Sequence, residues 1–203
     1  MPAAAATVTP GEVSPRRSVP ATIRRPEYVD RPAPAPFDGS EIKDAETIER
    51  MRVAGRVAAQ AMAAAAEVIA PGVTTDEIDR VGHEFLLDHG AYPSTLGYRG
   101  FPKSVCTSVN EEIVHGIPGE RVLRAGDLLS IDCGAQVDGW NGDAAMTVVV
   151  GGDDAGRPED VELSAATRAS LWAGVAALRA GGRISDVGEG VQSSIEASGA
   201  ADG

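Results

Sequence analysis

Two apolar runs joined by an Asp-Gly pair at 138–139 constrain the fold of this chain more than any other feature. Such a pair is a strong signal for a two-residue β-hairpin turn, because both central positions take positive φ. This turn pairs Asp132 with Ala145 and Gly134 with Asp143 across the two strands. Asp132 and Asp143 are therefore predicted to lie on one face of the hairpin as diagonal neighbours, within reach of each other.

Carboxylates that converge in an apolar strand pair repel each other and lose solvation unless a positive charge lies between them. A divalent metal ion supplies that charge, and paired carboxylates suit a site with two ions roughly 3.5–4 Å apart. The alternative is that one of the two acids is a solvated residue at the end of the hairpin. The spacing therefore predicts a metal site at Asp132 and Asp143, with a turn residue as the other interpretation.

Composition narrows the class of protein. The chain has 203 residues, 43% of them hydrophobic, which is enough for one sizeable core. A net charge of −12 repels nucleic-acid phosphates and anionic lipid. No run reaches the roughly 18 apolar residues of a membrane span, and Cys106 and Cys133 are too few for a disulfide scaffold. We expect a cytoplasmic monomer that binds neither membranes nor specific DNA.

The first 40 residues differ from the rest of the chain. They hold most of the 13 prolines and no periodic apolar pattern, so they bury too little surface to offset the entropy of ordering. Residues 1–40 are predicted to be a disordered or polyproline-like extension, followed by one domain over 41–203. The extension is basic, which indicates either a solvated leader or an arm that contacts a polyanion such as the ribosome; residues 32–36 also form a PxxP-type segment.

The remaining chain alternates between helical and strand-like patterns. Apolar residues recur at three and four positions in the helical segments, with Pro71-Gly72 as a break and Thr74 or Thr75 as an N-cap. Short apolar runs bounded by Gly and Pro indicate strands. The expected helices cover 43–70, 74–90 and 163–198, and the expected strands cover 104–109, 112–117, 128–135 and 140–150.

A shift of 109 residues aligns the first helical pair with the last. It places Met62 on Leu171 and Gly72 on Gly181, among other matches. Two unrelated amphipathic helix pairs could match by coincidence, but the shared glycine spacing favours a duplicated helix–helix–strand unit.

The three histidines carry different expectations. His83 and His89, in and near the end of the second helix, are expected at the surface or as a C-terminal cap. His115 lies in an expected strand between Gly and Pro, and its position alone leaves core and active site equally open.

Four segments closely resemble type I methionine aminopeptidases of the M24 peptidases, and the resemblance extends over about residues 40–200. They are the turn 71–75, the run 97–111, the motif His115-Gly116-Ile117-Pro118, and the eleven-residue step from Asp132 to Asp143. The Pro-rich leader is similar to the extension of actinobacterial members. The resemblance implies an α+β pita-bread fold with internal duplication, here its first half and the first helices of the second.

The resemblance also implies roles for individual residues. Asp132 would be a bidentate metal ligand, Asp143 a bridging ligand, and His115 a catalytic residue that contacts the substrate. Two divalent ions, Co, Mn, Fe or Zn, would be the cofactors. Residues that would line the pocket for the methionine side chain are Tyr98, Phe101 and Cys106.

The implied activity is removal of the initiator methionine from nascent peptides. The family completes its metal site with one histidine and two glutamates from a second set of strands, and no histidine follows His115 here. We therefore expect the 203 residues alone to be truncated and inactive. The alternatives are a non-catalytic remnant or a ribosome-associated module, and, disfavoured by the motif between Phe101 and Pro118, an X-Pro dipeptidase.

Overall fold

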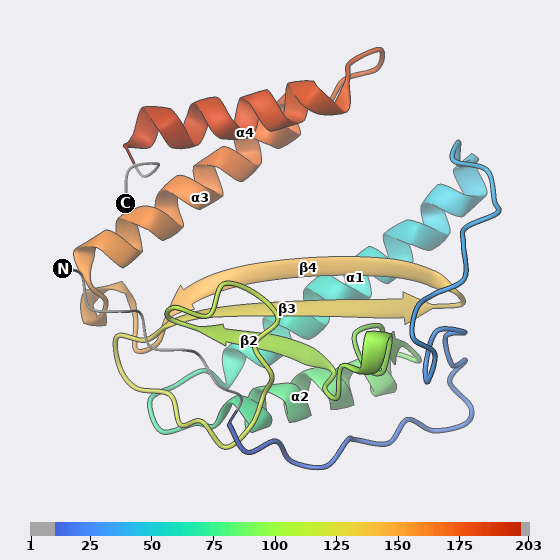
Figure 1. The fold of residues 1–203 in the computed structure, drawn as a ribbon, viewed down its shortest axis with the longest axis horizontal. Helices are drawn as coiled ribbons and strands as arrows, with labels where there is room; N and C mark the ends of the chain where they lie inside the picture. The colour runs from blue at the N-terminus through green and yellow to red at the C-terminus, as the bar shows by residue number, and fades with distance from the viewer. Residues whose placement is uncertain (1–10, 200–203) are drawn as a thin grey trace.

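The computed structural model describes residues 11–199 of the chain. One antiparallel sheet lies against two helices, and a second pair of helices projects beyond it (Figure 1). No helix in the described part of the chain is long and apolar enough to cross a membrane. The elements are α1 (Ala45–Glu67), α2 (Thr75–Asp88), β1 (Tyr92–Pro93), the 3-10 helix η1 (Tyr98–Gly100), β2 (Val105–Val109), β3 (Leu128–Val137), β4 (Trp140–Val149), the 3-10 helix η2 (Asp153–Ala155), α3 (Pro158–Ala177) and α4 (Ile184–Ser198).

The central strand of the sheet is β3. It pairs with β4 along one edge, and with β1 and β2 in succession along the other. The pairing of Asp132 with Ala145 and of Gly134 with Asp143 confirms the predicted hairpin register. The turn residue Asp138 has φ 50° and the glycine after it φ 90°, as a two-residue turn of this kind requires.

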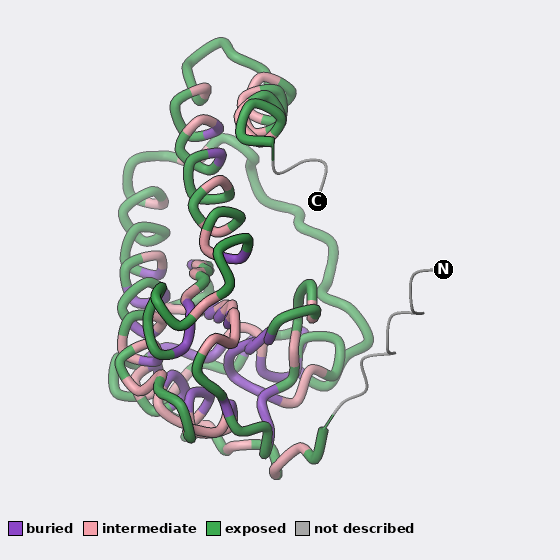
Figure 2. Tube along the Cα trace, turned by 90° about the vertical axis from the view of Figure 1, so that its left-hand side faces the viewer, coloured by how far each residue is buried: buried purple, intermediate pink, exposed green. Residues whose placement is uncertain are grey.

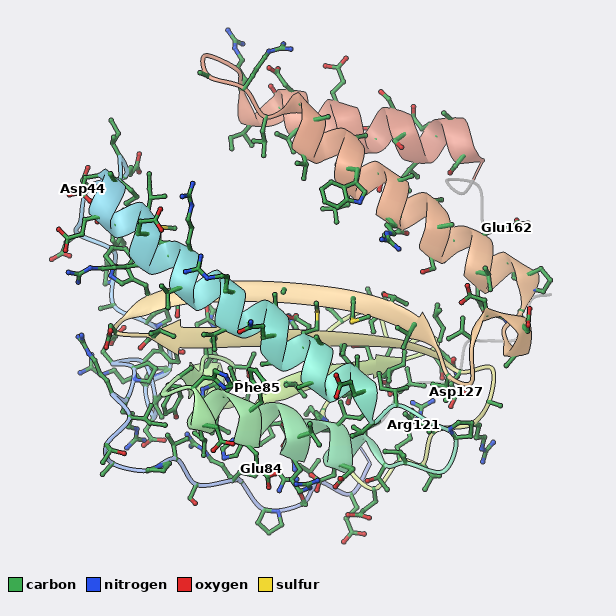
Figure 3. All side chains as sticks on the ribbon, turned by 180° about the vertical axis from the view of Figure 1, so that it is seen from behind. Asp44, Glu84, Phe85, Arg121, Asp127 and Glu162 are labelled. Carbon is green, nitrogen blue, oxygen red and sulfur yellow. The ribbon has the colours of Figure 1, made fainter. Side chains whose placement is uncertain are left out.

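Helices α1 and α2 cover one face of the sheet; from behind, both lie in front of it (Figure 3). Alternate residues of β3, from Leu129 to Ala135, are buried in the core clusters that these helices complete. The buried face of α1 is rich in alanine, so the helix approaches the strands closely. A Cβ at Gly142 of β4 would collide with the backbone of Ala54 and Gly55, which explains glycine there.

Both helices of the first pair have side-chain N-caps. The carboxylate of Asp44 accepts a hydrogen bond from Thr47 N–H, and the hydroxyl of Thr74 accepts one from Glu77 N–H. Of the two threonines expected as a cap, Thr74 is the one used. His89 caps the C-terminus of α2, as expected, with its ring stacked on Phe85 at 4.0 Å between centroids.

The second helical pair reproduces the spacing of the first. α4 begins at Ile184, 109 residues after α2 begins at Thr75, which agrees with the predicted repeat (184 − 75 = 109). α3 and α4 pack on each other and leave Leu171 and Trp172 exposed. Buried residues concentrate instead in the sheet and in the helices against it (Figure 2).

The strand expected over 112–117 is wrong: this segment is a loop. The chain turns at Asn110, with φ 57°, and Glu112 accepts the Val109 N–H through its side chain. Gly116 then lies against β2, where its carbonyl oxygen accepts the Thr107 N–H at 2.9 Å. The segment therefore turns back on itself and hydrogen-bonds to β2 at single positions. It does not form a continuous strand pairing.

The extension has neither helix nor strand over 11–40, yet it packs along α2 and β1 (Figure 1, blue). Ser14 donates a 2.6 Å hydrogen bond to Asp76, and Tyr28 and Val29 are buried in a cluster with Tyr92. This packing differs from the disordered leader expected from composition. A few ion pairs and buried side chains hold the segment in place, although its sequence lacks the apolar repeat of a helix or a strand. Residues 1–10 of the expected leader lie outside the described part.

His83 was expected at the surface but is buried. Its Nε2 lies 3.1 Å from the carbonyl oxygen of Ser18, an acceptor only, so Nε2 carries the proton and Nδ1 accepts from Ser104 at 2.7 Å. Burial lowers the pKa of His83; the Ser18 hydrogen bond and the charges of Asp79 and Glu84 oppose this, whereas the charge of Arg17 adds to it.

This arrangement predicts a loss of stability in mild acid. The folded-state pKa of His83 lies below the ordinary 6.5, so on acidification the unfolded chain takes up the proton first and the free energy of unfolding falls. We expect urea midpoints measured from about pH 7 to about pH 5 to decline less steeply in His83→Gln than in the parent. His89→Gln, at the exposed cap, should keep the parental slope; equal slopes in all three proteins would contradict this role of His83.

Candidate metal centre

The two predicted metal ligands meet on the sheet face that α1 and α2 leave uncovered. Asp132 is half-buried in β3 and Asp143 is exposed in β4, two positions beyond the partner of Asp132. Burial, followed by the charge and the hydrogen bond of Asp143, raises the pKa of Asp132 to about 6. A half-buried carboxylate beside a second acid is stabilised in its charged form by a nearby cation.

Two more predicted residues lie beside this pair. Cys106 is buried in β2 directly opposite Asp132, and burial, followed by the charges of the two acids, raises the pKa of its thiol to about 12. His115 lies in the loop after β2 with φ 57°, and its charge lowers the pKa of Asp132, which places it near the pair. The strand register therefore places Cys106, Asp132 and Asp143 on one face of the sheet, with His115 in the loop that follows β2.

The loop that carries His115 is held by its neighbours on β2. Gly116 N–H donates to the Ser108 hydroxyl at 3.1 Å, and a Cβ at Gly116 would collide with the carbonyl of Thr107. Glu112, which anchors the start of the loop, pairs with Arg121 at 2.9 Å. A glycine directly after His115 is thus required by close approach of the two backbones.

Tyr98 and Phe101 lie on a different segment, the loop between β1 and β2. Within that loop Gly97 N–H donates to the carbonyl of Phe101, and Phe101 N–H donates to that of Tyr98. The Tyr98 ring meets the Tyr28 ring edge-on, with centroids 5.3 Å apart. The contacts in the described residues join these two pocket candidates to each other and to the extension rather than to the carboxylates.

An ionic cluster at the start of β2 has no counterpart in the sequence-based expectations. Asp79, fully buried on α2, accepts the backbone N–H groups of Ser104 and Val105, at 2.7 and 3.1 Å, and pairs with Arg17 at 2.9 Å. Buried Lys103 pairs with Asp76 and lies 4.0 Å from Asp79. The sequence signal for this cluster was the i, i+3 spacing of Asp76 and Asp79 on one helix. That signal does not identify the partners of the two acids, because these partners are 24 or more residues away in sequence.

The two carboxylates offer the type of donor atom that a metal ion binds. Asp132 and Asp143 offer hard oxygen donors of like charge, which suits a divalent ion. Over residues 11–199 no group of three or more His, Cys, Asp or Glu is arranged to hold a metal. Within the described residues, the pair by itself therefore offers a cation two carboxylate groups.

Comparison with known proteins gives a consistent result. A family model described as "Metallopeptidase family M24" matches residues 49–203. Methionine aminopeptidase 2 of Mycobacterium tuberculosis is 56% identical over 146 residues, which are 71% of this chain and 50% of that protein. The mitochondrial methionine aminopeptidase 1D of Dictyostelium discoideum is 42% identical over 185 residues, 90% of this chain and 45% of that protein. The chain spans about half the length of these relatives.

Solved structures agree on the fold. The crystal structure of methionine aminopeptidase from Rickettsia prowazekii matches with a TM-score of 0.73 at 35% identity, covering 77% of this chain and 62% of that one. The Thermotoga maritima enzyme gives 0.65 at 35% identity, covering 68% and 55%. Pseudomonas aeruginosa aminopeptidase PepP, at 21% identity, TM-score 0.64 and coverage of 77% and 34%, shows the same fold. The predicted α+β pita-bread architecture is confirmed.

Proposed function

The chain belongs to metallopeptidase family M24, in its methionine aminopeptidase group, and from this we propose that the whole protein removes the initiator methionine from nascent peptides. The observation that carries the proposal is the convergence of Asp132 and Asp143 on an uncovered sheet face. A pair of acids so placed accounts for a metal-dependent reaction better than for a structural role.

Each residue of the site has a proposed task. Asp132 and Asp143 would hold the ions, which when bound supply a Lewis acid and a hydroxide source near neutral pH. His115 lies on a loop that hydrogen bonds hold against β2, and it would donate a hydrogen bond to the substrate carbonyl as negative charge develops there. Cys106, with Tyr98 and Phe101, would form the apolar slot for a flexible thioether side chain.

The 203 residues by themselves are proposed to lack this activity. Two carboxylates bind a divalent ion weakly, because tight catalytic sites use three or more protein ligands. His115 is the last histidine of the sequence, and residues 11–199 contain no group of three or more His, Cys, Asp or Glu arranged to hold a metal. The identity and the number of the metal ions are thus properties of the whole protein. Contact with the ribosome, a monomeric state and a cytoplasmic location stay predictions.

A peptide panel tests both statements. The whole protein, assayed with Mn²⁺, should release methionine from Met-Ala-Ser and leave Ala-Pro-Ser intact, while the purified 203-residue chain should release none. Cleavage of Ala-Pro-Ser in preference to Met-Ala-Ser would instead indicate an X-Pro peptidase. Robust methionine release by the 203-residue chain would show that its own residues suffice.

A further inference from the structure

A cavity of about 480 Å³ lies between the extension and β1 and shares no lining residue with the carboxylate pair. Apolar side chains form much of its wall, with the hydroxyl-bearing ring of Tyr92 among them. Among residues 11–199, no acidic residue lines it. The arginines of its wall are Arg16, Arg17, Arg24 and Arg25.

Within the described structure, three of these four guanidinium groups have N–H donors that are free to bind a further acceptor. Arg17 is committed to Asp76 and Asp79. Within the described part of the chain, the side-chain hydrogen bonds of Arg16 are two long ones, 3.4 Å each, to Asp30 and to the Tyr92 hydroxyl.

Arg25 pairs with the same Asp30, which therefore serves two arginines at once. Arg24 makes no hydrogen bond or ion pair with any residue between 11 and 199. Two of these arginines thus share one carboxylate and the third has no ion-pair partner among residues 11–199, so the cavity wall carries an excess of positive charge.

We propose that this cavity binds a small organic phosphate, a phosphomonoester with an apolar or aromatic body. The guanidinium fork matches phosphate oxygens in paired hydrogen bonds, which makes arginine the residue suited to such a group. Arg16, Arg24 and Arg25 would hold the phosphate, and Ile23 and Leu96 would cover the body of the molecule. The volume lies within the range of about 300–1,000 Å³ usual for ligand sites.

The charge distribution favours a small ligand over a nucleic acid. The chain as a whole carries −12, so a long polyanion meets repulsion over most of its contact surface. Beside the cavity a second hollow is lined by Arg24 together with Asp88 and Asp138, which places acids along the path that an extended strand would take. A single phosphomonoester stays within reach of the arginines, and charges beyond about 8–10 Å are screened.

Calorimetric titration of the purified chain with phenyl phosphate tests the proposal, with inorganic phosphate and phenol as partial ligands. We expect one site that binds phenyl phosphate at least tenfold more tightly than either part. Arg24→Gln, which removes a side chain with no partner in the described fold, should weaken binding at least tenfold. Arg50→Gln, which removes an exposed arginine paired with Glu46 on α1, is the matched control and should leave binding unchanged.

Three results would overturn the proposal. They are no binding of phenyl phosphate at millimolar concentration, equal weakening by Arg24→Gln and Arg50→Gln, or tight binding of a ten-nucleotide oligouridylate without binding of phenyl phosphate. None of these readouts uses peptidase activity, so failure here and failure of the proposed function are distinguishable.

Discussion

Replacement of Asp132 by Asn in the whole protein should reduce methionine release from Met-Ala-Ser by about a thousandfold or more, which corresponds to about 4 kcal/mol of transition-state stabilisation. Asn keeps the shape of the side chain but removes one of the two carboxylates that lie close together on β3 and β4. The expected cause is lost metal, so Mn²⁺ affinity measured by calorimetry should fall together with the rate.

Asp138 provides the matched control for this substitution. It is exposed at the tip of the same hairpin with φ 50°, a conformation that Asn adopts readily. Asp138→Asn should therefore keep activity and Mn²⁺ affinity within a factor of two or so of the parent. Retention of more than about a tenth of the activity by Asp132→Asn would exclude this carboxylate as a metal ligand.

The second large effect concerns stability. Asp79→Ala should lower the free energy of unfolding by about 3–5 kcal/mol, because it leaves buried cations with too few partners. Within the described fold, Arg17 and Lys103 would then share Asp76 as their one carboxylate partner, and the N–H groups of Ser104 and Val105 would lose their acceptor. Unsatisfied donors in the interior add to the cost of the lost ion pairs.

Urea denaturation of the purified chain measures this effect. Glu46→Ala also removes a carboxylate from an ion pair with arginine, but at an exposed position on α1, so it should cost no more than about 1 kcal/mol. A difference between Asp79→Ala and Glu46→Ala below about 1 kcal/mol would show that the buried cluster does not stabilise the fold.

Arg17 comes from the extension, so the cluster also ties the extension to the domain. The remaining groups, Asp76, Asp79 and Lys103, carry a net charge of −1, and Arg17 neutralises them. The extension, which its composition predicts to be disordered, thus supplies the charge that neutralises this buried cluster.

The local sequence determined the hairpin, the helices and the repeat. The Asp-Gly turn sets the register of β3 and β4, because a two-residue loop allows one alignment of the two strands. Side chains alternate along each strand, so this alignment also decides which face of the sheet each side chain lies on. Asp132 and Asp143 were found for that reason. Thr74 and the helical periodicity act within one or two turns, so they too can be interpreted without the fold.

Tertiary structure alone decided the positions of His115, His83 and the extension. An apolar run after β2 resembles a strand, but Gly116 packs on Thr107 and turns the run into a loop. Arg17 lies 62 residues from Asp79, and His83 lies 65 residues from Ser18. Such contacts depend on which surfaces the folded elements place together, and no local pattern encodes that choice.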